Sequence, residues 1–501
     1  MKTNYKVLIV ILVGLFLTCC EKNLDPKMYG SLTVDEYFSD VNSIDASVNA
    51  AYQALQDEGG YKNAMWAIGD IASDDTYYGD DKLDGLDGDP NTGQLTSMWR
   101  AHYKGIYRCN VVLNRIDGII FAANRVGLKP QYKGQVLFLR ALFYFNLVRV
   151  FGDVPLITNE IKTAEEAYVG RDPITKIYAQ IIADAKSAVD LLPEVYSTSI
   201  PNTGMSQDKG RATKGAALML LSSVYLTLKD YTNAKDYATQ ILNLTNKYSL
   251  LPAYGDLFCK PYSGAGNTYP LENTAESIFE VQFGDQSGRG TQANWWMGPQ
   301  SWDTSLRWNR PTDKTNKDAG AFVAFTDKST LMQEFETGDA RATAAIFSTS
   351  NSVDVNASTG LPWKFCGKYL VKGKTNNNDP ANFPVFRYAE TLLILAETEN
   401  ETNGPANAYQ YINQVRTRAG LTNVASGLTK DQFRDVVFHE RRVELCFEAK
   451  RWFDLVRTGR MESTMSAHLG KTVNAYQNIF PIPKLERDVN PLLVQNPGYA
   501  Q

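Results

Sequence analysis

The most restrictive feature of the 501-residue sequence is one helical spacing that occurs twice. The first copy runs from Leu218 to Ile241 and the second from Leu392 to Val415. In both copies the matching positions, nearly all apolar or small, stand at offsets 0, 3, 4, 7, 16, 20 and 23. Steps of three and four place side chains on one helix face. Little more than Lys229-Asp230 separates the two helices of the first copy, which predicts an antiparallel hairpin.

This spacing is that of a tetratricopeptide helix pair, with small residues such as Ser222 and Ala234 where the helices cross. Trp is missing from the first position of both copies, as in degenerate forms of the repeat. Leu137, Ala141 and Tyr144 would open a further unit whose partner helix follows a long insertion. An ordinary helical hairpin is the alternative for each unit alone, but a register shared by two units argues against coincidence.

Periodic segments elsewhere predict a mostly α protein. The expected helices cover residues 33–58, 98–119, 132–150, 174–192, 212–228, 231–244, 387–400, 405–419 and 430–457. Segment 132–150 is apolar nearly all round, which predicts deep burial. Residues 251–380 are rich in Gly, Pro, Asn, Thr and Trp, with a strand pattern only at 276–283 and a short helical one at 329–335. We therefore expect a tetratricopeptide-like helical-pair scaffold with long irregular insertions and little β-structure.

The N-terminus has the pattern of an export signal. Lys2 and Lys6 precede an apolar run at residues 7–17, which is too short for a membrane-spanning helix of roughly 20 residues. The residues before Cys20 resemble a bacterial lipobox, so residues 1–19 are expected to be a signal peptide and Cys20 the lipidated residue. Lipidation at Cys19 and ordinary secretion with two thiols are the alternatives.

Composition excludes several functions. The formal net charge of −4 gives no basic excess for binding nucleic acid. Histidine-based metal or triad chemistry is improbable because the chain has only three histidines: His102, His439 and His468. The remaining cysteines have no regular spacing and are expected to be buried, with one disulfide among them left open: Cys109, Cys259, Cys366 and Cys446.

Half of the eight tryptophans stand within residues 294–308. The cluster consists of Trp295, Trp296, Trp302 and Trp308, interspersed with polar residues such as Asn294. Flat indole faces match the apolar faces of sugar rings, and polar side chains match the hydroxyl rims. We predict a glycan platform here. The alternative is that these tryptophans pack only against their own loop.

A second cluster has eight aspartates within residues 70–89. An EF-hand beginning at Asp80 fails, because position three is Lys82 and position twelve is Asn91. A solvated loop is favoured, and a calcium loop of another type stays open as the one cofactor considered. The secondary ligand contacts are expected to be Tyr77 and Tyr78 with Asp74 and Asp75, whereas Trp99, on a helix face, is expected in the core.

Glu440 and Glu444 lie one helical turn apart, a spacing that could imitate the carboxylate pair of a glycosidase. Four arginines on what reads as the same helix favour a buried ion-pair network instead: Arg441, Arg442, Arg451 and Arg457. The sequence contains no GxSxG, HExxH, P-loop or GxGxxG context.

An ordered set of motifs resembles the SusD-like (SusD/RagB) family of outer-membrane lipoproteins. Examples are Gly152-Asp-Val-Pro155, Arg387-Tyr-Ala-Glu390 and Pro481-Ile-Pro483. The complete set follows the lipobox at residues 36–40, 49–53, 99–110, 139–155, 210–217, 387–393, 413–420, 440–448, 451–457 and 481–483. Ala449 departs from the pattern, since many relatives have Gly there, and we interpret it as a conservative change within a helix.

The resemblance implies a lipid-anchored protein at the outer membrane, facing the cell exterior, without catalytic activity. It implies binding of a glycan, or in some members a peptide, and delivery to a SusC-like TonB-dependent transporter. It also implies an N-terminal helical region at 20–250 and a C-terminal SusD/RagB region at 251–501, in one compact unit, with helix pairs facing the barrel and ligand loops opposite. A secreted glycoside hydrolase is the alternative from another class.

Overall fold

The computed structural model describes residues 37–38, 40–76, 82–123, 125–196, 210–245, 248–258, 272–284, 288–293, 329–348, 364–369 and 380–500. Within these ranges the chain is predominantly helical, with four short strands. The predicted mostly α fold with little β-structure is therefore confirmed. The export signal, Cys20 and the predicted start of the first helix at Thr33 lie outside the described residues.

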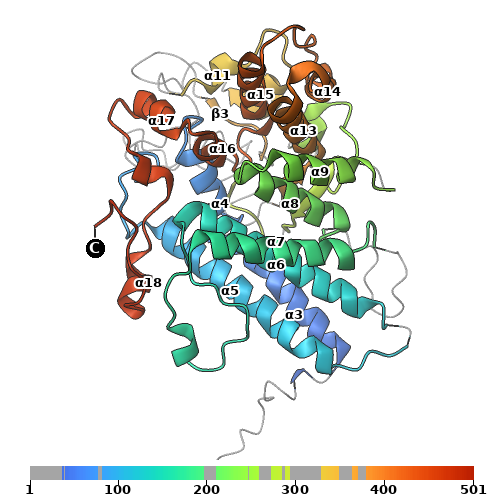
Figure 1. Cartoon of the computed structure of the whole chain (residues 1–501), viewed down its shortest axis with the longest axis vertical. Helices are drawn as coiled ribbons and strands as arrows, with labels where there is room; N and C mark the ends of the chain where they lie inside the picture. The colour runs from blue at the N-terminus through green and yellow to red at the C-terminus, as the bar shows by residue number, and fades with distance from the viewer. Residues whose placement is uncertain are drawn as a thin grey trace, which may run out of the picture.

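Helices that are neighbours in sequence pack against one another along most of the molecule. The series consists of α3 (Val41–Gln53), α5 (Gly93–Arg115), α6 (Leu128–Phe151), α7 (Ile174–Leu191), α8 (Lys214–Thr227), α9 (Tyr231–Leu242) and α13 (Tyr388–Asn403). Both α14 (Tyr409–Arg418) and α15 (Lys430–Leu445) then pack on α13. Figure 1 shows this stack from the blue helices to the brown ones. Each pair predicted from the repeated spacing, α8 with α9 and α13 with α14, is in contact.

The turn between α8 and α9 explains why the first repeat is so short. Lys229 takes a left-handed conformation with φ of 59°, which reverses the chain within two residues. Asp230 then caps α9, because its carboxylate accepts a hydrogen bond from the backbone N–H of Asn233 at 3.1 Å. Where the helices cross, the Ser222 hydroxyl donates to the Ala234 carbonyl at 2.9 Å. A small residue is required there because the backbones approach closely.

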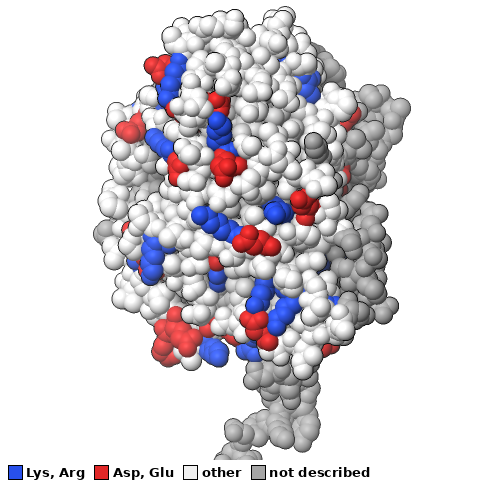
Figure 2. Space-filling model, turned by 45° about the vertical axis from the view of Figure 1, so that its right-hand side comes forward, with Lys and Arg blue, Asp and Glu red and all other residues white. Residues whose placement is uncertain are grey.

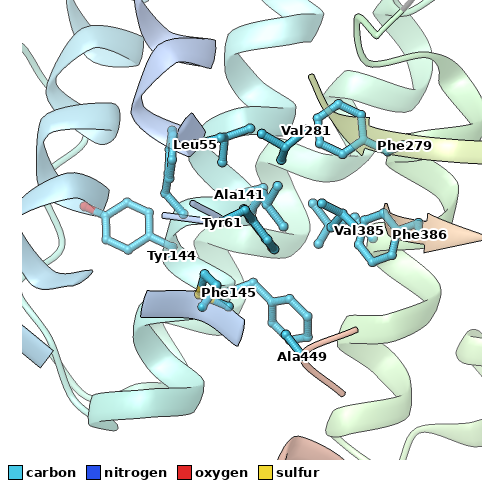
Figure 3. Packing of buried hydrophobic residues seen from close by; sticks show 14 of the residues in the cluster. Leu55, Tyr61, Ala141, Tyr144, Phe145, Phe279, Val281, Val385, Phe386 and Ala449 are labelled. Atoms are coloured by element: carbon cyan, nitrogen blue, oxygen red, sulfur yellow. The ribbon is translucent and has the colours of Figure 1, made fainter. Parts of the chain in front are cut away.

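Helix α6 lies at the centre of the core. It is apolar and long enough to cross a membrane, yet 89% of its most apolar window is buried inside the protein. This is the burial that its uniform apolar character predicts. Phe138 of α6 meets Phe279 of strand β1 (Ser277–Val281) with ring centroids 4.9 Å apart. Figure 3 shows side chains from α6, from strand β1 and from strand β4 gathered in one apolar cluster.

The strands form two antiparallel pairs. Strand β1 pairs with β4 (Phe383–Arg387), and β2 (Ile346–Ser348) pairs with β3 (Lys364–Cys366). The remaining helices are short: α4 (Ala64–Trp66), α11 (Leu331–Glu334), α12 (Arg341–Ala345), α16 (Arg451–Thr458), α17 (Met461–Leu469) and α18 (Lys484–Val489). Trp99, buried on α5, packs edge-on against Phe151, as expected of a core residue.

The single helix expected over residues 430–457 is wrong, because the chain breaks between α15 and α16. Phe447 and Ala449 have φ of 62° and 56°, which no right-handed helix accommodates. The backbone N–H of Ala449 donates to a carboxylate oxygen of Asp70 at 3.0 Å, which holds the break in place. Ala449 is therefore not a conservative change within a helix. It occupies a left-handed position that favours glycine.

Cys109, Cys366 and Cys446 are free and buried, as expected. Burial raises the pKa of the Cys446 thiol to about 12, so the residue is a small apolar core group and not a nucleophile. Cys259 lies outside the described ranges.

Candidate ligand-binding site

The principal predicted contacts lie outside the described residues. They are Asn294, Trp295, Trp296, Trp302 and Trp308, together with Tyr77 and Tyr78. The structure does describe the residues on either side of these segments. Thr76 precedes the tyrosines, Ala293 precedes the tryptophan cluster, and Ser329 follows it. The positions of these flanking residues show where both segments begin or end.

Residues 288–293, which lead to the tryptophan cluster, are fastened to the start of α4. The Gln292 backbone N–H donates to the Lys62 carbonyl at 3.3 Å. The Asn63 side-chain amide donates to Gln292 Oε1 at 3.0 Å, and Lys62 Nζ donates to the Gly288 carbonyl at 3.2 Å. This segment is therefore attached to the element that leads through Asp70 to the predicted tyrosines.

The far end of the tryptophan segment returns to the same region. The Ser329 hydroxyl donates to the Asp75 carbonyl at 3.0 Å, and Asp75 lies two residues before Tyr77. The Thr330 hydroxyl accepts from Arg442 Nη2 at 3.2 Å. Ser329 and Thr76 therefore leave the described structure side by side. The far end of the tryptophan segment therefore meets the start of the tyrosine segment, whereas its near end is bonded at Lys62 and Asn63.

Arg442 of α15 is the central residue of this anchor. Its Nε donates to Asp75 Oδ1 at 2.7 Å, and its Nη1 donates to Glu334 Oε1 at 2.7 Å. Arg451 of α16 donates to both oxygens of Asp74, at 2.7 and 2.9 Å. Burial alone would raise the pKa of Asp74, but the two arginines outweigh it and lower the pKa. This carboxylate is therefore charged and paired.

The predicted ligand contacts Asp74 and Asp75 are thus placed in the interior, with exposures of 5% and 0%. Burial beneath two arginines separates them from solvent, which differs from the surface position that we expected. They support the anchor. This role has no local signal in the sequence, because their arginine partners follow more than 350 residues later.

Other aspartates of this segment, where the structure describes it, are also buried or paired with basic side chains. Asp70 is buried, and burial raises its pKa well above the usual range. Asp89 pairs with Lys82, and Asp87 pairs with Lys471 at 3.0 Å. These carboxylates therefore meet cations of the protein itself or a backbone N–H.

Glu440 and Glu444 belong to a buried ion-pair network, as predicted. Glu440 Oε1 accepts from Arg341 at 2.5 Å, and Glu444 Oε1 accepts from Arg418 at 2.5 Å and Arg387 at 3.0 Å. Burial would raise the pKa of Glu444, yet the arginines lower it to about 2. A general acid requires the opposite shift.

The partners of this pair differ from those expected. We predicted Arg441, Arg442, Arg451 and Arg457 on the same helix, but Arg451 and Arg457 lie on α16 after the break. Arg441 pairs with Asp454 at 2.9 Å, and Arg457 pairs with both Asp454 and Glu397. The arginines that neutralise the two glutamates come instead from distant segments.

One group in the described residues has the donor set of a metal site: Glu336, His439 and Glu440. Its buried member, Glu440, already accepts from Arg341 and from Arg416 at 3.1 Å. Arg416 also holds Glu336 at 2.6 Å. A cation would have to displace two guanidinium groups, so the arrangement favours the ion pairs.

The sequence matches two related family descriptions. Residues 347–499 match the SusD family, and residues 24–226 match a SusD-like family described as "Starch-binding associating with outer membrane". SusD-like protein P2 of Formosa agariphila is 26% identical, with 99% of this chain and all of the relative aligned. The starch-binding protein SusD of Bacteroides thetaiotaomicron is 22% identical over 79% of this chain and 76% of its own.

Solved structures share the fold. A laminarin-binding SusD-like protein has a TM-score of 0.73 and 25% identity, and the match covers 92% of this chain and 100% of that one. Surface glycan-binding protein A of Bacteroides uniformis has a TM-score of 0.72 and 25% identity, with 91% and 99% covered. The fold of this chain therefore recurs in proteins whose names include laminarin or glycan binding.

Proposed function

The chain belongs to the SusD family, and from this premise we propose that it is a cell-surface lipoprotein that binds a glycan and passes it to a SusC-like TonB-dependent transporter. Relatives named for binding starch, laminarin and other glycans support the ligand class. The predicted lipid anchor at Cys20 supports the location, and the family resemblance supports the partner.

The observation that carries the ligand proposal is that both ends of the tryptophan segment are bonded to the stretch of chain that leads to the predicted tyrosines. The residues before the tryptophan cluster are bonded to residues 62–63, and Ser329 after it is bonded to Asp75, two residues before Tyr77. Tryptophans and tyrosines on segments that meet in this way can form one stacking surface. Stacking of aromatic rings on sugar faces requires no charge.

The face of the molecule drawn in Figure 2 carries charges of both signs. Figure 2 shows basic and acidic residues interspersed on the visible face, without a large area of one sign. A neutral glycan would be held by stacking and hydrogen bonds, whose strength changes little with salt. An acidic or basic peptide would require a field of the opposite sign.

We propose that the protein does not hydrolyse its ligand. A retaining or inverting hydrolase needs one carboxyl with a raised pKa beside a second carboxylate in a cleft. The pair at helical spacing, Glu440 and Glu444, is fully buried and each member contacts arginines. Release of reducing ends by the pure protein, abolished in Glu440→Gln, would contradict this proposal.

The ligand proposal is tested by alanine substitution of each tryptophan: Trp295, Trp296, Trp302 and Trp308. For at least one, glycan affinity should fall about thirtyfold, equivalent to about 2 kcal/mol, with an unchanged melting temperature. Titration against a panel of laminarin, starch and peptides gives the ligand class. Trp99→Ala is the matched control, because removing this core side chain should lower the free energy of unfolding by roughly 3–5 kcal/mol.

Two outcomes would contradict the ligand proposal. If all four substitutions lower the melting temperature sharply and leave affinity intact, the tryptophans only pack and the platform lies elsewhere. If the protein binds a peptide and no glycan, it belongs with the peptide-binding members of the family.

A further inference from the structure

A groove with an aromatic floor crosses one face of α5. Its volume is about 320 Å³, and Trp99 and Tyr103 of α5 line it with their ring centroids 5.0 Å apart. The segment that runs from Pro155 through the 3-10 turn η4 (Glu165–Ala167) forms one wall, and α18 forms the other. A hollow of this size has room for large side chains or a small ligand.

Both walls are fixed in place by hydrogen bonds. The Tyr103 hydroxyl donates to the Pro155 carbonyl at 2.9 Å, and Glu486 of α18 pairs with an arginine of α5 at 2.6 Å. Asn490, which also lines the groove, donates to a backbone carbonyl of the opposite wall at 2.9 Å. The groove is therefore preformed, and these polar side chains are already bonded within the chain. Such a lining favours apolar occupants over sugar hydroxyls.

Large apolar side chains are exposed around the groove. Tyr107, Tyr168 and Val489 line it and are 43%, 46% and 62% exposed. Leu485, one helical turn before Val489 on α18, is exposed as well. Apolar side chains gathered on one face mark an interaction surface in soluble proteins, because a partner that covers them removes them from water.

This apolar face lies toward the predicted membrane attachment. Tyr107 also lines a second hollow, of about 350 Å³, together with Tyr37 and Phe38, where the described chain begins. Sixteen residues separate Tyr37 from Cys20, so a lipid at Cys20 would keep this hollow within about 60 Å of the membrane. Figure 1 shows α3, α5 and α18 in the lower half of the view, and α11 and α15, near which the predicted ligand segments begin or end, at the top.

The charges on the same face are paired. Lys104 of α5 pairs with Asp57 at 3.0 Å, and Lys484 of α18 pairs with Asp488 at 2.6 Å. A surface that binds anionic lipid carries basic residues in excess around its apolar side chains. Paired charges around two hollows therefore favour a protein partner, whose projecting side chains can enter them.

We propose that the two hollows that meet at Tyr107 form a docking face for a membrane-embedded partner, whose outward loops insert aromatic or aliphatic side chains. This inference rests on the proposed function, in which that partner is the SusC-like transporter. Tyr107, Tyr168 and Val489 become buried in the complex, while the predicted ligand segments at the other end of the molecule stay accessible. Docking and glycan binding therefore depend on different residues.

Photo-crosslinking in the native cells tests the face directly. The full-length protein carries p-benzoylphenylalanine in place of Tyr107 or Val489, or in place of Asp431 as the control, which is exposed at the start of α15. Irradiation should link the first two positions, but not Asp431, to a TonB-dependent barrel identified by mass spectrometry. Products from Tyr107 and Val489 that contain only lipid or a second copy of this chain would overturn the proposal, as would a barrel linked through Asp431 alone.

Co-purification from detergent-solubilised membranes measures the contribution of one residue. Val489→Asp should recover about tenfold less barrel than wild type, because the substitution places a charge in an apolar contact. Val195→Asp is the matched control, since Val195 is also exposed but follows α7 and lines neither hollow. The melting temperature and the glycan affinity of Val489→Asp should equal those of wild type, which excludes misfolding as the cause.

Two results distinguish the docking face from the proposed function. If Val489→Asp and Tyr107→Ser recover as much barrel as wild type, docking uses another face and the inference is wrong, while the transporter remains the partner. If wild type itself recovers no barrel, both the partner and the docking face are contradicted.

Discussion

His102, buried on α5, couples the stability of the protein to pH. Its Nδ1 lies 2.8 Å from the Met98 carbonyl, and its Nε2 lies 3.2 Å from the side-chain nitrogen of Asn146. The network assigns the proton to Nδ1 and leaves Nε2 as an acceptor. Burial lowers the pKa of His102 from 6.5 to about 4, because the charged imidazolium would lose its hydration, and the positive charge of Arg149 lowers it further.

The sign of the pH effect follows from this shift. Below pH 6.5 the unfolded chain binds a proton at His102 that the folded protein does not, so stability falls between about pH 6.5 and pH 4. The contribution at pH 5 should be about 2 kcal/mol less than at pH 8. Urea unfolding of wild type and His102→Gln at both pH values measures it. An equal pH dependence in the two proteins would contradict the prediction.

Gly69 is a second residue whose identity is required by its surroundings. A Cβ at this position would lie 2.4 Å from Ala449 Cα, inside the contact between the π-helical turn Ala67–Ile71 and the break after α15. We expect Gly69→Ala to lower the free energy of unfolding by about 2 kcal/mol, measured by urea titration. Gly93→Ala is the control, since nothing lies within 4 Å of its added Cβ. Equal stability of both variants would exclude a steric role for Gly69.

At the scale of elements, two of the arginines on α15 should contribute very differently to the free energy of unfolding. Arg442 is buried against Asp75 and Glu334, whereas Arg434 is partly exposed and pairs with Glu401. Arg442→Met should cost roughly 3–5 kcal/mol because it leaves a buried charge unpaired, and Arg434→Met should cost at most about 1 kcal/mol. The free energy of unfolding from chemical denaturation provides the comparison.

The same pair of variants tests the anchor of the predicted ligand segments. At a temperature where Arg442→Met is still folded, its glycan affinity should be lower than that of Arg434→Met, because Arg442 contacts Thr330 and Asp75 beside both segments. Equal affinities would mean that the anchor supports stability alone.

Helical spacing predicted the elements well because it depends on local sequence. The α8–α9 and α13–α14 pairs follow from steps of three and four residues, and the deep burial of α6 follows from its apolar character. The break at Ala449 was missed because its cause, the hydrogen bond to Asp70, joins residues 379 positions apart. Asp74 and Asp75 were misplaced for the same reason. A solvated aspartate and one paired with a distant arginine look identical in sequence.

On the scale of the whole molecule, the fold and the predicted lipid attachment at Cys20 together determine where a ligand could be presented. The helical stack is built largely from contacts between successive helices, while ion pairs join segments far apart in the chain, such as Arg387 with Glu448 at 2.7 Å. We propose that this body is attached to the membrane by its N-terminus. The attachment itself rests on the prediction for Cys20.

We expect Cys20→Ala to release the protein from the membrane. Each buried CH₂ of an acyl chain contributes about 0.8 kcal/mol, so several chains on one cysteine hold a protein firmly and their loss leaves nothing comparable. Wild type should partition into the detergent phase of a Triton X-114 separation, and Cys20→Ala into the aqueous phase. Cys19→Ala, one residue earlier, is the matched control and should partition like wild type. If Cys19→Ala alone loses the detergent phase, lipid is attached at Cys19, and if neither variant changes, the chain is not a lipoprotein.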